Sequence, residues 1–260
     1  MIVDYHVHSK FSPDGESSVL ELVEAAIIRE IDEIAITDHY EGLSPYGEYK
    51  DEDFIEEVEK VSALYRHNIK IKKGLELGYP YLWDSTTRNL LAKHKYDFIL
   101  ASAHGHEGVE YYTHDFTGED MNAFSAKYFK ELHKTIDFMD FDCLGHIDLL
   151  KRYTFNFGMK YDIMKYKEEL EGILKRIVAL GKGIEINTSG LRQNIGCTMP
   201  ELDVLKFYRE LGGEILTVGS DSHCAADVGK DIDIAVELAA TAGFRYIATY
   251  VERNCEFILL

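Results

Sequence analysis

Histidines and carboxylates recur along this chain in short groups, and each group directly follows a run of apolar residues. The first group, His6 and His8, closes such a run near the N-terminus. Seven of the 11 histidines belong to these groups. Imidazole nitrogens and carboxylate oxygens, without cysteine, favour Zn, Mn or Fe and leave coordination positions for water. The other groups are Asp38 and His39, Glu76, His104 and His106, His146 and Asp148, and Asp221 and His223.

A single histidine of this kind has a second interpretation, because it could be a hydrogen-bonded packing residue. The whole set favours metal binding, since many imidazoles and carboxylates that meet in one cleft have few other ways to be satisfied. The other four histidines lie on or beside predicted helices or in a loop, and we expect them at the surface. They are His67, His94, His114 and His133.

The elements that must position these groups follow from the hydrophobic pattern. Short β-branched runs alternate with longer amphipathic stretches, which is typical of repeated βα units. With 260 residues, 46% of them hydrophobic, the chain suits one β/α barrel domain over residues 1–260. Strands are predicted at 2–8, 33–38, 70–77, 97–104, 142–147, 183–188 and 215–220, with a further candidate at 246–251. Helices are predicted at 19–30, 54–65, 123–137, 166–180, 202–211 and 234–242, and the longest loops at 14–18, 42–50, 105–120 and 151–161.

The C-terminal ends of parallel barrel strands meet at one mouth, so groups far apart in the sequence become neighbours there. His6 and His8 are two residues apart, so both should point into the barrel. Glu76 should also point inward because Leu75 and Leu77 point away, which makes it the candidate for a bridging carboxylate. Its other interpretation is a solvated charge at a strand end. Three further acids are expected either to support the ligands from behind or to face the helices: Asp4, Asp38 and Asp148.

Charge and composition limit the partners. The formal net charge of -18, from 46 acidic and 28 basic residues, argues against a nucleic acid polymer as partner. A small phosphorylated substrate stays compatible, because bound cations reverse the local field. The sequence has neither a signal-peptide core nor an apolar run long enough for a membrane span, so we expect a cytoplasmic protein without a membrane partner. The spacing of the four cysteines predicts reduced thiols. We expect the protein to be a monomer or a homodimer.

Six motifs occur in a fixed order: HVH at 6–8, ITDH at 36–39, GLELG at 74–78, SAHGH at 102–106, LGHID at 144–148 and GSDSH at 219–223. This ordered set resembles the polymerase and histidinol phosphatase superfamily, abbreviated PHP, over almost the whole chain. The resemblance implies an α/β fold, a distorted, TIM-barrel-like (β/α)7 barrel with the active site at the C-terminal ends of its strands. The segment HVHSKFSPDG together with GLELGY resembles most closely the histidinol-phosphate phosphatase branch.

The resemblance also implies a cluster of two or three divalent cations, Zn, Mn or Fe. It assigns His6, His8, Glu76 and Asp221 to the first ion, Glu76, His104 and His146 to the second, and Asp14, His39 and His223 to the third. Asp14 has another interpretation, since an Asp before a glycine is also a common turn residue, and in that case the third ion would be labile.

Two arginines follow predicted strand ends and are candidates for binding phosphate, Arg152 and Arg192. A guanidinium is a natural bidentate partner of phosphate, and the resemblance points to the same pair. The alternative for each is a surface ion pair on this acidic protein. The prediction for His106 stays open between a contact with substrate and a contact with the loop.

The expected activity is hydrolysis of L-histidinol phosphate to L-histidinol and phosphate, a step of histidine biosynthesis. A metal-bridging hydroxide would be the nucleophile, without a protein nucleophile, and a metal-bound water, His223 or Asp14 would protonate the leaving oxygen. Three alternatives stay open. The first is another PHP activity, a phosphodiesterase, exonuclease or nucleotide phosphatase. The second is an amidohydrolase barrel, and the third is a barrel that binds metal without catalysing a reaction.

Overall fold

Seven parallel strands form the wall of a barrel in the computed structural model, which describes residues 1–42 and 49–260. The predicted loop at 42–50 therefore lies partly outside the described residues. Neighbouring strands in the wall are β1 (Val3–Val7), β2 (Glu33–Ile36), β4 (Lys70–Gly78), β5 (Phe98–Ser102), β8 (Cys143–Leu144), β9 (Gly183–Asn187) and β10 (Leu216–Gly219). A short strand, β3 (His39–Tyr40), continues from β2 and pairs with the end of β4.

The barrel closes between β1 and the residues that follow β10. The His8 amide donates to the Ser222 carbonyl and the Asp221 amide donates to the His6 carbonyl, both at 2.8 Å. Two predicted ligands, His6 and Asp221, are thereby fixed to each other by a backbone hydrogen bond, and a third, His8, is fixed to the residue between Asp221 and His223. The predicted seven-stranded, TIM-barrel-like α/β fold is confirmed.

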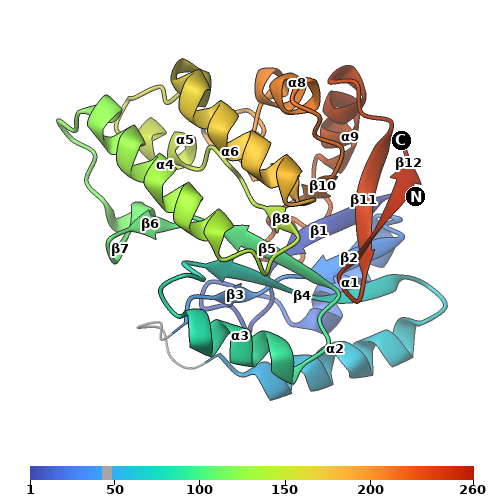
Figure 1. Ribbon diagram of the computed structural model, residues 1–260. Coiled ribbons are helices and arrows are strands. Elements are labelled where there is room, and N and C mark those ends of the chain that lie inside the picture. The colour runs from blue at the N-terminus through green and yellow to red at the C-terminus, as the bar shows by residue number, and fades with distance from the viewer. Residues whose placement is uncertain (43–48) are drawn as a thin grey trace.

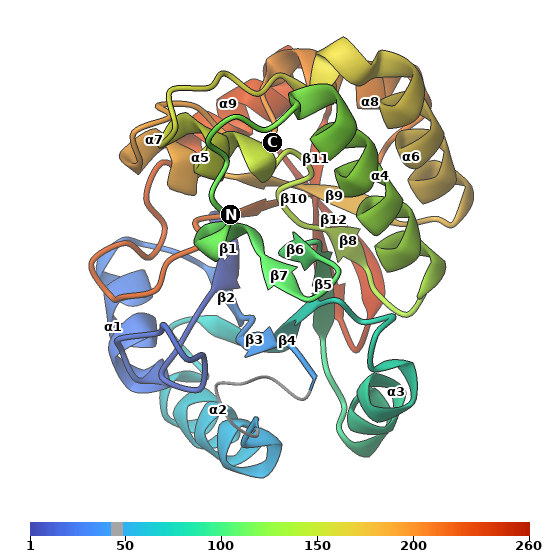
Figure 2. The same ribbon diagram turned by 90° about the vertical axis from the view of Figure 1, so that its left-hand side faces the viewer.

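Helices surround the strands, as Figure 2 shows. α4 illustrates why they pack there: Phe124, Tyr128, Leu132 and Ile136 recur every four residues and are all buried. Ser18 and Glu21 form a capping box that starts α1. The outer helices are α1 (Val19–Ile28), α2 (Asp51–Tyr65), α3 (Asp84–Lys93), α4 (Met121–Asp137), α6 (Lys167–Ala179), α8 (Leu202–Glu210) and α9 (Ile232–Thr241).

The last two strands, β11 (Tyr246–Val251) and β12 (Asn254–Leu259), form an antiparallel hairpin beside both chain termini (Figure 1). The predicted strand at 246–251 therefore exists, but it pairs with β12 outside the barrel. Glu252 and Arg253 have positive φ values of 46° and 68°, as a tight two-residue hairpin turn requires. The Tyr250 amide donates to the Tyr5 hydroxyl at 2.7 Å, so the hairpin covers the N-terminal end of the barrel.

Short elements at the opposite end build the mouth. A small hairpin of β6 (Gly105–His106) and β7 (Val109–Glu110) and a 3-10 turn (Tyr111–Thr113) occupy the predicted loop at 105–120. Helix α5 (Leu150–Phe155) carries Arg152, so the predicted loop at 151–161 is partly helical, and a second 3-10 turn (Ile163–Tyr166) precedes α6. Helix α7 (Ser189–Arg192) carries Arg192. Within the described residues, no helix is long and apolar enough to cross a membrane.

Candidate metal centre

The Glu76 carboxylate lies at the centre of the mouth, and its side chain is only 1% exposed. β4 points it inward between Leu75 and Leu77, as the strand alternation predicts. The Ser102 hydroxyl donates to Oε1 at 2.6 Å. Five imidazole nitrogens surround the two oxygens: His146 Nε2 at 3.0 Å and His104 Nε2 at 3.1 Å from Oε1, and His39 Nδ1 at 2.9 Å, His6 Nε2 at 3.3 Å and His8 Nε2 at 3.5 Å from Oε2.

A second carboxylate, Asp221, approaches the same imidazoles from β10. Its Oδ1 lies 3.7 Å from His6 Nε2, 3.5 Å from His8 Nε2 and 3.6 Å from His223 Nδ1. The backbone of Asp221 has a φ of 53°, a conformation that is uncommon for a non-glycine residue and that turns the chain directly after the strand. Residues of this kind are concentrated at functional sites.

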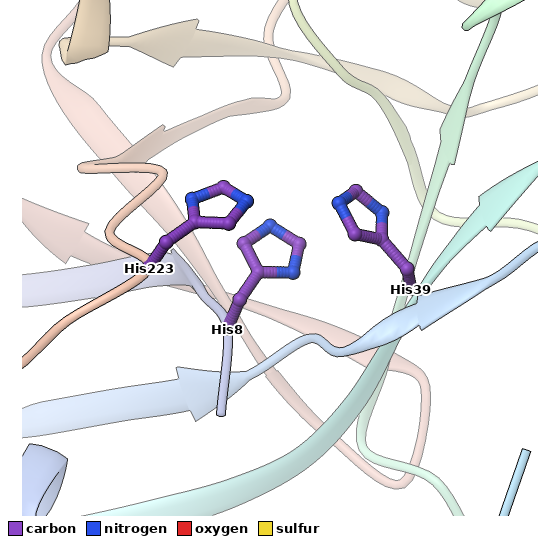
Figure 3. Close-up of side chains that lie close together, drawn as sticks. All are labelled: His8, His39 and His223. Carbon is purple, nitrogen blue, oxygen red and sulfur yellow. The ribbon is translucent and has the colours of Figure 1, made fainter. Parts of the chain in front are cut away.

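Three histidines from distant parts of the chain gather at the outer side of the centre (Figure 3). The His8 ring stacks on His39 and on His223, with ring centroids 4.2 Å and 4.3 Å apart. Asp14 completes this side, since its Oδ2 lies 3.2 Å from His223 Nε2 and 3.7 Å from His39 Nε2. The Asp14 side chain is 57% exposed, so this side of the centre is open to solvent.

The donor atoms fit divalent cations. Among the buried polar atoms that have no hydrogen-bond partner in the described residues, four face one another at the centre: His6 Nε2, His8 Nε2, His39 Nδ1 and Glu76 Oε2. Each such atom costs about 1–3 kcal/mol if nothing compensates it, and all four converge on one place. In the part of the chain that the structure describes, four groups have ligand atoms within 4.8 Å of one another: His8, His39 and His223; His6, His8 and Asp221; His6, Glu76 and His146; and His39, Glu76 and His104.

These groups bring together every predicted ligand except Asp14, which lies beside His223. They divide the residues differently from the three implied sets, since His8 here also joins His39 and His223. The role of each residue as a ligand stays a prediction.

The two carboxylates of the centre, Glu76 and Asp221, remain ionised. Burial alone would raise the pKa of Glu76, but the neighbouring His6 and His104 hold it well below its ordinary value. Burial would likewise raise the pKa of Asp221, and Arg152 and His6 reverse that effect. The centre therefore offers two permanent negative charges to cations.

His6 on β1 and His8 directly after this strand differ in their pKa shifts. Burial would lower the pKa of His6, but Glu185 and Glu76 raise it well above its ordinary value. Burial lowers the pKa of His8 well below its ordinary value, and the positive charge of His39 adds to the effect. His8 is therefore neutral and ready to act as a ligand, whereas a cation at His6 must displace a proton.

Both predicted phosphate-binding arginines reach the rim next to Asp221. On α5, Arg152 Nη2 donates to Asp221 Oδ2 and to the Ser189 hydroxyl, each at 2.6 Å. On α7, Arg192 donates from Nη2 to the Asp221 carbonyl at 2.8 Å and from Nε to Asp227 Oδ2 at 3.1 Å. Both line a cavity of about 410 Å³. Phosphate binding stays a prediction for each arginine.

A family model for the PHP domain matches residues 4–189. The chain belongs to the PHP domain family. The histidinol-phosphatase of Lactococcus lactis is 28% identical over 256 residues, which cover 95% of this chain and 94% of that protein. A crystal structure of histidinol phosphate phosphatase from Lactococcus lactis, complexed with zinc, L-histidinol and phosphate, superposes with a TM-score of 0.83 at 27% identity and covers 98% of both chains.

A cavity at the mouth of this PHP barrel has a volume of about 470 Å³, which suits a small ligand. It opens onto Glu76, His104, His146 and Asp221, and Glu41, Glu110, Tyr112 and Tyr153 also line it. His106 is not among its lining residues. Its ring instead stacks on Tyr111 and meets the edge of Phe124, with centroids 5.9 Å and 5.1 Å apart, so His106 contacts the loop.

Two acids of the site were missed by the sequence analysis. Glu41 Oε1 lies 2.7 Å from His104 Nδ1, and Glu185 Oε1 lies 2.6 Å from His6 Nδ1. A signal existed for each of them. Glu41 follows His39 by two residues and so shares its direction, and Glu185 is a charged residue between two apolar ones, Ile184 and Ile186, in a predicted strand.

The three acids expected behind the ligands are all buried. Asp4 accepts from the Ser220 amide at 2.8 Å, Asp38 accepts from the Ser9 amide at 2.6 Å, and Asp148 pairs with Lys151 at 2.8 Å.

Proposed function

We propose that this PHP protein is a metal-dependent phosphatase that hydrolyses L-histidinol phosphate to L-histidinol and phosphate. One observation carries the proposal. Buried imidazole nitrogens and a carboxylate oxygen converge at the barrel mouth, and these atoms have no hydrogen-bond partner among the described residues. The full-length likeness to the Lactococcus lactis enzyme, whose structure holds zinc, L-histidinol and phosphate, supports the choice of substrate.

Two or three divalent cations, Zn, Mn or Fe, would occupy the centre. Bound there, they would supply a nucleophilic water at neutral pH and neutralise the phosphoryl oxygens. Glu76 is suited to bridge two ions because its two oxygens face different imidazoles. The proposed ligands are His6, His8, Asp14, His39, Glu76, His104, His146, Asp221 and His223.

The remaining roles belong to side chains around the cavity. Arg152 and Arg192 would bind the phosphate oxygens, and Asp227 would hold Arg192 in place through its Nε contact. His223 and Asp14 line the cavity at the barrel mouth and would protonate the leaving oxygen. Glu41 and Glu110 line the same cavity and are complementary to the ammonium and imidazole groups of L-histidinol.

The test is an assay of phosphate release from L-histidinol phosphate, a nucleoside monophosphate and a short oligonucleotide, each with and without a chelator. We expect rapid, chelator-sensitive release from L-histidinol phosphate and little from the other two. Cleavage of the nucleotide substrates alone would identify a different PHP activity. Release that a chelator does not affect would contradict the proposal.

A further inference from the structure

Glu185 lies directly behind the metal centre, on β9, with its side chain only 1% exposed. Its Oε1 lies 2.6 Å from His6 Nδ1. Its Oε2 accepts from the His146 amide at 3.0 Å and from Asn187 Nδ2 at 3.2 Å. One buried carboxylate thus contacts the ring of one predicted ligand and the backbone of another.

The contact with Glu185 determines which nitrogen of the His6 ring carries a proton. A carboxylate only accepts hydrogen bonds, so His6 Nδ1 must carry the proton that it donates to Glu185. The opposite nitrogen, Nε2, then faces Glu76 Oε2 at 3.3 Å and Asp221 Oδ1 at 3.7 Å and is the atom that can bind a cation.

Close strand packing makes the contact possible. Gly219 on β10 lies against the same pair, and a Cβ at this position would lie 2.3 Å from His6 Cβ and 2.6 Å from Glu185 Oε1. Both distances are shorter than any normal contact. A side chain at residue 219 would therefore push His6 and Glu185 apart.

We propose that Glu185 is a positioning residue that holds His6 in the ring orientation and tautomer required for metal binding. The inference rests on the proposed function, because it assigns a task within the same metal centre. Metal-binding histidines commonly donate their second nitrogen to such a carboxylate.

The substitution Glu185→Gln separates this role from simple packing. Two N–H donors, from His146 and Asn187, face the Oε2 position, so the amide oxygen of the glutamine should turn toward them. Its NH2 group would then face His6 Nδ1, which must accept, and a neutral His6 would carry its proton on Nε2. Shape is nearly conserved, but the metal-binding nitrogen is blocked.

The experiment measures metal affinity by competition with a chelator and metal content by elemental analysis, alongside thermal unfolding of the metal-free proteins. We expect Glu185→Gln to weaken binding about 10–100-fold. Glu131→Gln is the matched control, because Glu131 is equally buried on α4 but pairs with Tyr81 and Lys134, and it should bind metal normally.

Glu185→Asp is a second variant, since it keeps the buried charge but withdraws it from His6 Nδ1. We expect weaker metal binding here too. Normal affinity in either folded variant would overturn the inference while the proposed function stands. If the wild-type protein binds no divalent cation, the proposed function fails as well.

Discussion

Two buried carboxylates, Glu76 and Asp221, organise the imidazoles that arrive from separate strands. Both were predicted from the sequence, because a strand-end acid at an inward position has few alternatives. Their partners could not be predicted, because the spacing of residues along the chain reveals neither the order of strands around a barrel nor the orientation of side chains. The contact between Arg152 and Asp221 and the place of Glu41 beside His104 are examples.

Substitution of Glu76 by Gln should remove the bridging charge while its shape is kept. We expect the loss of at least one ion per chain and a fall in kcat/KM of about 100-fold or more, because the imidazoles around it lose their common partner. Metal analysis and phosphate release measure the two effects. Glu33→Gln, at a buried acid on the first residue of β2, is the control and should keep both values. Full metal content in Glu76→Gln would contradict the bridging role.

The two arginines should differ in their effects. Arg192→Ala would remove the proposed phosphate contact and should raise KM about 10–100-fold with normal metal content, since a charge-assisted hydrogen bond contributes about 1.5–3 kcal/mol. Arg152→Ala should also lower the metal content, because Arg152 holds Asp221. Steady-state kinetics and elemental analysis of both variants test this difference. Equal metal loss in the two variants would argue against it.

At the scale of elements, periodicity predicted the barrel strands to within a few residues. β8 was predicted too long, because only Cys143 and Leu144 keep the ladder before the chain turns toward the mouth. Helix α3 was missed because its sequence is polar and Thr87 is its only buried residue. The strand at 246–251 was correct in type, but its partner β12, a largely exposed strand, was not predicted.

The hairpin of β11 and β12 gives a prediction that concerns stability. Arg253 donates to the buried Asp142, whose oxygen also accepts from the Ile99 amide. Arg253→Ala leaves this acid without its cation and should lower the free energy of unfolding by about 1–3 kcal/mol. Urea denaturation of the metal-free protein measures the change. An unchanged free energy of unfolding would mean that the Arg253–Asp142 pair does not stabilise the fold.

The same variant has a defined pH dependence. Burial raises the pKa of Asp142 in the folded protein, although Arg253 lowers it. A raised folded pKa favours the folded state at acid pH, and this stability is lost as the pH rises through that pKa. Removal of Arg253 raises the pKa of Asp142 further. The loss in free energy of unfolding caused by Arg253→Ala should therefore be small at acid pH and reach its full size at neutral pH. A deficit that grows toward acid pH would contradict this account.

At the scale of the whole molecule, the centre joins residues from strands between β1 and β10. It lies where the barrel closes, through the backbone hydrogen bonds of Asp221 to His6 and of His8 to Ser222. Bound cations should therefore stabilise the entire fold. Free metal at 100 times its Kd adds about 2.7 kcal/mol per site, which corresponds to a rise in Tm of roughly 5–10 °C. Thermal unfolding with metal and with chelator measures the shift, and identical midpoints would contradict it.

The most direct test of the central claim is a titration of chelator-treated protein with a divalent cation while phosphate release from L-histidinol phosphate is followed. The account predicts negligible activity without metal and a rise that saturates at two to three equivalents per chain. Full activity in the metal-free protein, or none at any metal content, would contradict it.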